Sequence, residues 1–313
     1  MRSKRMLYIK YMSRRLRHKL LIDKLGMKYP KTGRICGQPI PSDEEANGVI
    51  AQLIREGKPF SLLRPGNAEY SLVSQWDEHI LFGTKRYRKQ KMFDCIDRND
   101  GLAQKWAETF EQDLKDADVI ACFGKCDYME HYLIEAYAKP KRIIMLGQIE
   151  VMQLENPWLS ELKGKKVLVI SPFVETMEKQ YEKRSQIWGG REILPEMDIR
   201  FLKSVWYMSA EDNSGFADWF EALEYLYEEA GKIDFDIALI GCGPFSTFLA
   251  ARFKRNGKQA IQYGGALQML FGVRGARWDN MEKYSRYFNE HWVRAPIKEA
   301  PAAYSKLDDR CYW

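Results

Sequence analysis

The chain has 313 residues and a mass of 36.7 kDa, enough to bury a substantial core as one large domain or two small ones. Its 45% hydrophobic and 29% charged residues are typical of an ordinary soluble globular protein. No apolar run reaches the roughly 18–20 residues that a membrane-spanning helix needs, which argues against an integral membrane protein.

The net charge of +6 comes from the first 24 residues, which carry nine Lys or Arg against the single acid Asp23. The remainder has 40 bases and 42 acids and is close to neutral. A mildly basic chain suits an anionic ligand such as a nucleotide diphosphate or a lipid phosphate. We predict no nucleic-acid partner.

Apolar residues recur at helical spacing in residues 1–24, at Ile9, Met12, Leu16 and Leu20, with bases between them. Such a basic amphipathic helix can lie on an anionic membrane surface. It can equally pack on the body of the protein and expose its charges to solvent, and the sequence does not separate these two interpretations. Residues 28–41, rich in Pro and Gly, have the composition of a linker.

The six cysteines form no CxxC pair, and Cys122 and Cys126 have no second pair with which to build a zinc site. Their apolar surroundings indicate free thiols in a reducing compartment. No signal-peptide pattern precedes them. We therefore predict a cytoplasmic protein, with peripheral contact at the inner face of the membrane if residues 1–24 lie on lipid.

Short apolar strands alternate with amphipathic helices from residue 42 onward. In chain order we expect a helix over 42–57, a strand over 60–64, helices from 69 and over 102–115, a strand over 118–123, a helix over 128–138, a strand over 142–146, a helical stretch to 158, a strand over 166–170, a helix over 175–188, a strand over 199–206, a helix over 216–229, a strand over 235–240, a helix to 256 and a strand over 259–263. This alternation predicts an α/β, Rossmann-like, doubly wound and mostly parallel sheet with helices on both faces.

The predicted organisation has three parts. Residues 1–41 form a basic arm and linker, and residues 42–277 form the α/β domain. Residues 278–313, rich in aromatic and charged side chains, form an extension that packs on this domain.

The first candidate site follows the strand over 60–64, because ligands of doubly wound sheets bind at the carboxyl ends of the strands. There the chain reads Arg64-Pro65-Gly66-Asn67-Ala68-Glu69. Arg64 is suited to pairing with phosphate, and Glu69 to binding a divalent cation or accepting a proton. Taken locally, the simpler explanation is a helix start with Asn67 as its cap and Glu69 favoured by the helix dipole.

A second candidate is the glycine turn Gly241-Cys242-Gly243-Pro244, between a strand and a helix, where backbone N–H groups can bind phosphate. It also resembles the glycine motif of S-adenosylmethionine-dependent methyltransferases. Only about 70 residues follow it, and Gln262-Tyr263-Gly264-Gly265 closes the next strand where such an enzyme needs an acid. A glycine pair alone is weak evidence.

The third candidate is Ser171, at the end of the strand over 166–170, followed by Glu175, Gln180 and Arg184. Ser171 can contact a ligand, whereas ordinary structural roles explain the other three better. The four histidines form no HExxH or HxE pattern, and neither a GxSxG turn nor a Walker motif is present. These absences argue against hydrolases and kinases.

Taken together, these segments resemble the GT-D-type glycosyltransferases, bacterial Rossmann-like enzymes that use nucleotide sugars. The resemblance spans about residues 42–290 and rests on the order and spacing of four blocks, 60–69, 165–173, 236–243 and 257–268. Residues 64–69 are similar to the family's strand, Arg-x-Gly and Asp-x-Glu signature. This chain has Asn67 in place of the first carboxylate.

The resemblance implies a transferase that moves a hexose from a nucleotide sugar, such as UDP-glucose, to a glycan, glycoprotein or lipid-linked acceptor in surface polysaccharide biosynthesis. It implies catalytic roles for Glu69 and Arg64, and a divalent metal, Mn²⁺ or Mg²⁺, at Glu69 and Asn67. Asn67 brings no charge, so metal binding should be weaker. The residues assigned to the nucleotide sugar are Gly66, Asn67, Ser171, Gly241, Gly243 and Gly265.

Two further hypotheses remain. Asn67 and the basic arm suit a catalytically weak module that binds nucleotide sugars or docks partner enzymes at a membrane. The third hypothesis is a methyltransferase that uses S-adenosylmethionine.

Overall fold

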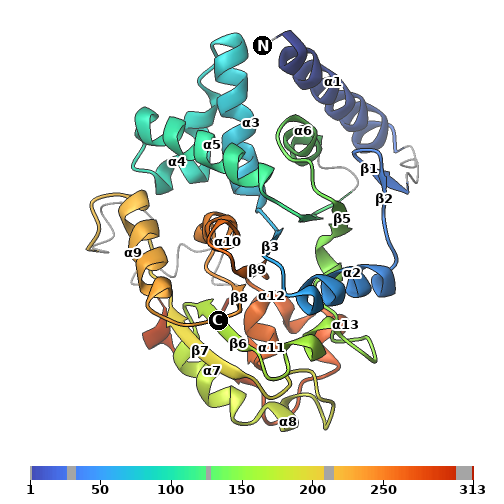
Figure 1. Ribbon diagram of the computed structural model, residues 1–313. Helices are drawn as coiled ribbons and strands as arrows, with labels where there is room; N and C mark the ends of the chain where they lie inside the picture. The colour runs from blue at the N-terminus through green and yellow to red at the C-terminus, as the bar shows by residue number, and fades with distance from the viewer. Residues whose placement is uncertain (1, 27–32, 125–127, 208–214, 301–311) are drawn as a thin grey trace.

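The computed structural model describes residues 2–26, 33–124, 128–207, 215–300 and 312–313 (Figure 1). Its central sheet has seven strands in the order β5-β4-β3-β9-β8-β6-β7, and every neighbouring pair is parallel. In that order the strands are Arg142–Met145, Val119–Cys122, Phe60–Leu63, Gln259–Gln262, Ile237–Ile240, Lys166–Ser171 and Asp198–Lys203. Strand β9, the last of the seven in the chain, lies between β3 and β8 and joins the two halves of the sheet.

Helices cover both faces of this sheet (Figure 1). Side chains of one strand alternate between two buried clusters, as in β8, where Ala238 and Ile240 enter one and Ile237 and Leu239 the other. The first cluster contains α3 (Asn67–Phe82), α5 (Asp100–Lys115), α6 (Tyr128–Ala136), α9 (Trp219–Gly231) and α10 (Phe245–Arg255). The second contains α2 (Asp43–Glu56), α7 (Val174–Tyr181), α8 (Arg184–Ile187) and α11 (Leu267–Leu270). The predicted doubly wound α/β fold is confirmed.

Local signals in the sequence set the start and end of α2. Ser42 Oγ accepts the N–H of Glu45 at 3.2 Å, and Glu45 Oε2 accepts the N–H of Ser42 at 2.8 Å, which completes a capping box. Gly57 ends the helix in the left-handed conformation, with φ of 68°. This helix directs the chain into β3, whose end carries the first candidate site.

The basic N-terminal segment forms helix α1 (Arg2–His18), followed by a wider turn over Lys19–Lys24. It packs on the body through Tyr8 and Tyr11, both buried, and Tyr8 donates a hydrogen bond to Glu78 of α3 at 3.0 Å. The helix therefore packs on the body of the protein through its tyrosines, and not through the apolar residues that the sequence pattern indicated. The apolar residues Ile9 and Leu16 are 51% and 63% exposed.

The segment predicted as a linker is anchored where the structure describes it, at residues 33–41. It forms a small antiparallel pair of β1 (Arg34–Ile35) and β2 (Gln38–Pro39), with Ile35 buried. The Gln38 side chain donates to the carbonyl of Pro140 at 3.0 Å and accepts from the N–H of Ile143 at 3.0 Å. It thus fixes this segment to the edge strand β5. Residues 28–32 of the predicted linker, and Cys126 and Cys311, lie outside the described residues.

Two helices predicted from the sequence take different forms. The helix over 175–188 breaks into α7 and α8, since the chain turns after Tyr181 in a way that buries Ile187 and Trp188. The prediction of a helical stretch up to Trp158 is wrong. Short 3-10 turns replace it at Leu146–Gln148 and Trp158–Leu162, and Pro157 excludes helical geometry just before the second.

The segment after β9 wraps the second cluster with short elements. These are α11, β10 (Val273–Arg274), α12 (Ala276–Asp279), α13 (Glu282–Ser285) and β11 (Val293–Arg294), which pairs in parallel with β10. Trp278, Tyr284 and Trp292 are buried among them. One further short helix, α4 (Lys91–Cys95), lies between α3 and α5.

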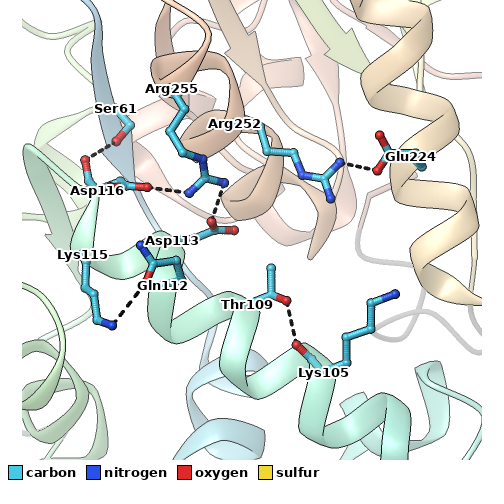
Figure 2. A network of polar contacts seen from close by, with 10 residues as sticks. All are labelled: Ser61, Lys105, Thr109, Gln112, Asp113, Lys115, Asp116, Glu224, Arg252 and Arg255. Atoms are coloured by element: carbon cyan, nitrogen blue, oxygen red, sulfur yellow. Dashed lines mark hydrogen bonds and ion pairs between the residues drawn. The ribbon is translucent and has the colours of Figure 1, made fainter.

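A polar network joins helices on the first face of the sheet (Figure 2). Arg255 of α10 pairs with Asp113 of α5 at 2.8 Å and also with Asp116. Arg252 pairs with Glu224 of α9 at 2.7 Å. Burial raises the pKa of Asp113 to about 7, although the nearby charge of Arg255 acts against this shift. Helices α5, α9 and α10 are thus joined by ion pairs as well as by their apolar cluster.

Candidate active site

Arg64, directly after β3, is fixed between strand ends. Its backbone N–H donates to Gln262 Oε1 at 2.8 Å, and its guanidinium donates to the carbonyl oxygen of Tyr263. Arg64 Nη2 lies 3.2 Å from Glu150 Oε1, with both side chains largely buried. The strand end of β3 therefore places a cation at the carboxyl edge of the sheet, next to the segment that follows β9.

Glu150 is a member of this site that the sequence did not single out. It follows β5 and accepts from Lys283 at 3.1 Å and from the hydroxyl of Tyr284. Two cations and a tyrosine therefore surround one buried carboxylate, which holds Arg64 in place. A search of the polar residues that follow each predicted strand would have found Glu150, because β5 ends only five residues earlier.

Glu69 is buried at the start of α3 and turns back toward Gly66. Its carboxylate accepts hydrogen bonds from the backbone N–H groups of Gly66 and of Glu69 itself. Burial raises its pKa, and these two hydrogen bonds act in the opposite direction. A Cβ atom at position 66 would lie 2.4 Å from Glu69 Oε2, so only glycine admits this arrangement without displacing the carboxylate.

The helix cap differs from the one expected. Gly66 is the N-cap of α3, and Asn67 is its first helical residue, exposed and with no capping role. Asn67 lines a groove beside α3, while Glu69 is buried against Gly66. As arranged, a neutral amide and a buried carboxylate do not fit a divalent cation. The described part of the chain also contains no cluster of three or more His, Cys, Asp or Glu suited to a metal.

Four predicted donor-binding residues meet in one pocket of about 190 Å³ at the carboxyl edge of the sheet. Ser171, Gly241, Gly243 and Gly265 line it, from the ends of β6, β8 and β9. Arg64, Gly66, Asn67 and Glu69 are not among its lining residues. The sequence-predicted set therefore divides between this pocket and the start of α3, and the segment Tyr263–Gly265 connects the two.

The pocket has aromatic walls and unsatisfied polar atoms. Phe173, Trp206, Tyr207, Phe245 and Tyr312 contribute rings to its lining. Among the described residues that line it, Trp206 Nε1 and Gln268 Oε1 are buried with no hydrogen-bond partner. Buried polar atoms are nearly always paired in native proteins. This donor and this acceptor are closed to solvent in the structure, so a polar ligand can pair with them only when the pocket wall opens to admit it. Neither residue was singled out from the sequence, which gives no local signal for an unpaired buried atom.

The glycine turn after β8 allows close packing and opens a helix. A Cβ at Gly241 would lie 2.8 Å from the carbonyl oxygen of Gly264, and Gly243 has φ of 61°. Helix α10 begins directly afterwards, with no side chain capping its first N–H groups. Such an end attracts phosphate. Burial raises the pKa of Cys242 to about 12, which keeps this thiol protonated and argues against a nucleophilic role.

The other polar residues after β6 have structural roles, as expected. Ser171 Oγ accepts the N–H of Phe173 at 3.2 Å and shapes the turn at the pocket wall. Glu175 pairs with Lys203 and Lys298, which lowers its pKa to about 2. Gln180 donates to the carbonyl of His291 at 2.8 Å.

No protein-family model and no curated protein matches this chain. Two solved structures are similar to it. One is "A New Glycosyltransferase (DUF1792) from Streptococcus sanguinis", 12% identical over 83% of this chain and 95% of that chain, with a TM-score of 0.42. The other is a selenomethionine-substituted structure of domain of unknown function 1792, 13% identical over 80% and 98% of the two chains, with a TM-score of 0.40. At such low identities and scores, the fold assignment rests on this chain's own parallel sheet.

Proposed function

We propose that the protein is a glycosyltransferase that binds a nucleotide sugar, such as UDP-glucose, in the pocket at the ends of β6, β8 and β9. The observation that carries the proposal is the pocket itself, which combines aromatic walls, a glycine turn and two unpaired polar atoms. Uracil presents an N–H donor beside carbonyl acceptors, and so complements both Gln268 Oε1 and Trp206 Nε1. Aromatic rings provide the stacking surface for the base.

The diphosphate would lie at the Gly241–Gly243 turn, where the start of α10 supplies N–H donors and a positive dipole end. Arg64 stands beside Gly264 at the neighbouring strand end, and it would stabilise charge that develops on the leaving diphosphate. The raised pKa of Glu69 suits a general base. In this scheme an acceptor hydroxyl attacks the anomeric carbon, the bond from that carbon to the diphosphate breaks, and Glu69 takes the proton.

Binding of a divalent cation by Asn67 and Glu69 would require an arrangement different from the one observed. The carboxylate would have to leave Gly66 before it could join Asn67 around an ion. No step of the scheme depends on the metal. Donor hydrolysis in the presence of Mn²⁺, Mg²⁺ or EDTA measures its contribution directly.

The first experiment is hydrolysis of a panel of nucleotide sugars by the wild-type protein and by Glu69→Gln. We expect turnover of one donor and its loss, by a factor of about 100 or more, in the variant. Glu44→Gln, an exposed glutamate of α2, is the matched control. Turnover in Glu69→Gln equal to that of the control would contradict the role of Glu69.

The pocket assignment has its own test, in which UDP binding is measured by calorimetry. Trp206→Phe deletes an indole N–H at the pocket and should weaken UDP binding about tenfold. Trp106→Phe deletes an indole N–H that is also buried without a partner in the described structure, but in the apolar cluster, and should leave UDP binding unchanged. Equal affinity in the two variants would refute the pocket assignment.

A binding module without transfer activity is the second candidate. It is favoured by the internal pairing of Arg64 with Glu150 and of Glu69 with Gly66. UDP-sugar binding without hydrolysis or transfer would identify it. Nothing in the site favours methyl transfer, since β9 ends at Gln262, whose side chain is taken up by Arg64 and Thr247. Absence of S-adenosylmethionine binding would exclude that third candidate.

We also propose that α1 brings the enzyme to the inner face of a membrane, in the cytoplasm, for surface polysaccharide assembly on a glycan, glycoprotein or lipid-linked acceptor. Along the described stretches, no helix has the length and apolar character needed to cross a bilayer. Exposed Ile9, Leu16 and Leu20 among basic residues support contact with an anionic surface. Leu16→Glu should abolish sedimentation with vesicles containing 30% phosphatidylglycerol, whereas Ile297→Glu, at a similarly exposed position outside α1, should not. The same sedimentation for both variants would argue against α1.

A further inference from the structure

A groove of about 470 Å³ runs beside α3, separate from the pocket described above. Its lining comes from α1, α3 and α6 and from the turn after α3: Tyr8, Met12, Arg15, Asn67, Tyr70, Ser71, Ser74, Gln75, Glu78, Arg86, Tyr128 and Met129. The α3 residues among them recur at spacings of three and four and share one face of that helix. From Asn67 to Glu78 this face extends about 16 Å along the helix axis.

One end of the groove lies at the start of α3, where Asn67 lines it. Glu69 points to another side of the helix and is buried outside the groove lining, but its carboxylate turns back to Gly66, the residue before Asn67. A molecule in the groove would therefore reach the start of α3, where an attacking hydroxyl is needed. The groove extends from this point toward α1, the helix proposed to contact the membrane.

The groove is lined mainly by groups that bind sugars. Asn67, Ser71 and Gln75 offer two amides and a hydroxyl, and Tyr128 offers a ring with a polar tip. Tyr8, Tyr70 and Ser74 form the buried wall behind them. Few of the side chains are purely apolar. This composition suits a polyhydroxylated molecule better than a lipid tail or an apolar helix.

The groove carries a net positive charge. Arg15 and Arg86 both line it, against the single carboxylate of Glu78, which pairs with Arg86 at 3.4 Å. Within the described ranges, no carboxylate forms an ion pair with Arg15. Burial and the neighbouring Glu78 raise the pKa of Tyr8, while the charges of Arg86 and Arg15 act in the opposite direction, so both guanidiniums lie near the same hydroxyl.

We propose that this groove is the acceptor site and that the acceptor is a saccharide bearing a phosphate, held by Arg15 and Arg86 with its sugar along α3 and a hydroxyl at Glu69. The inference rests on the proposed glycosyl transfer. Guanidinium groups are the side chains best suited to bind phosphate oxygens. The phosphate can belong to a soluble sugar phosphate or to a lipid-linked sugar, and the test separates these two sources.

The experiment measures binding of glucose 1-phosphate in solution, and of a polyisoprenyl diphosphate-linked monosaccharide in detergent micelles, to the full chain. Arg15→Gln should weaken binding of the preferred probe at least about tenfold. Arg17→Gln removes the same charge from an exposed position of α1 outside the groove and should leave binding unchanged. Arg15 is exposed and makes no ion pair in the described structure, so its variant should fold normally.

The outcomes separate this inference from the proposed function. Donor hydrolysis, in which water is the acceptor, should be the same in Arg15→Gln and the wild type, and UDP should not compete with either probe. Binding of the soluble probe supports a sugar phosphate, and binding of the micellar probe alone supports a lipid-linked sugar. Three results would overturn the inference: neither probe binds, the Arg15 and Arg17 variants bind the probe equally well, or UDP competes with the probe. Absence of any donor hydrolysis by the wild-type protein would instead overturn the proposed function.

Discussion

Gly66→Ala tests whether the position of the Glu69 carboxylate matters for catalysis. The backbone at position 66, with φ of −82° and ψ of 166°, is one that alanine adopts readily. The new Cβ would, however, lie 2.4 Å from Glu69 Oε2, whereas ordinary contact begins at 3.4 Å. The carboxylate must therefore move by about 1 Å, a displacement that can reduce turnover about 100-fold. Loss of its hydrogen bond to the Gly66 N–H should lower the free energy of unfolding by about 1–3 kcal/mol.

The assay is donor hydrolysis by Gly66→Ala, with unfolding in urea measured in parallel. The control is Gly83→Ala at the other end of α3, where φ is 73° and no atom lies within 4 Å of the added Cβ. Its left-handed backbone costs alanine about 1–2 kcal/mol, a comparable destabilisation without contact with Glu69. Retained turnover in Gly66→Ala would refute the reasoning, as would equal loss of turnover in both variants.

Three further predictions concern the sheet and its helices. Gly241→Ala places a Cβ 2.8 Å from the backbone oxygen of Gly264, and should lower the free energy of unfolding in urea by about 1–3 kcal/mol and weaken UDP binding. Gly48→Ala, at an exposed position inside α2 with no atom within 4 Å, should instead raise that free energy by about 0.5–1 kcal/mol. Asp113 has a pKa of about 7 in the folded protein, against 3.8 normally. Between pH 4 and 7 the folded state therefore binds more protons than the unfolded state, so the free energy of unfolding should fall as pH rises through this range. This contribution amounts at most to the order of 4 kcal/mol, and Asp113→Asn should remove it from urea unfolding measured at pH 5 and pH 8.

Each of these predictions has a distinguishing outcome. A Gly241→Ala protein as stable as the wild type would show that the β8 and β9 turns can separate at no cost. A loss of stability in Gly48→Ala would mean that α2 needs the flexibility of glycine. A pH dependence in Asp113→Asn as steep as in the wild type, or as in the exposed control Asp94→Asn, would assign the effect to other carboxyls.

The strands and the glycine turns were predictable because their signals are local. The apolar run before Arg64 and the Gly241–Gly243 turn each mark the end of a strand. The ends of β3, β6, β8 and β9 lie at one edge of the sheet, as parallel pairing requires. The break after Tyr181 was not predictable, since burial of Ile187 and Trp188 decides it, and that depends on tertiary packing.

The site was predicted only in part, for the same reason. Ser171, Gly241, Gly243 and Gly265 follow predicted strands and meet in one pocket. The partners of Arg64 come from far along the chain, since Gln262 lies 198 residues after it. Glu150, which also pairs with Arg64, is in turn contacted by Lys283, 133 residues further on. The groove likewise depends on how α1 packs, and its buried tyrosines do not follow the apolar stripe that the sequence displays.

The central place of β9 has a consequence for synthesis of the protein. A ribosome completes β3, β4 and β5, and then β6, β7 and β8, before it adds the strand that lies between the two sets. Until then β3 and β8 each expose an unpaired edge, the kind of surface that recruits other chains. Nascent chains that stop short of Gln259 should therefore aggregate or require a chaperone, and the full sheet can close only late, as the many contacts between distant parts of the sequence also imply.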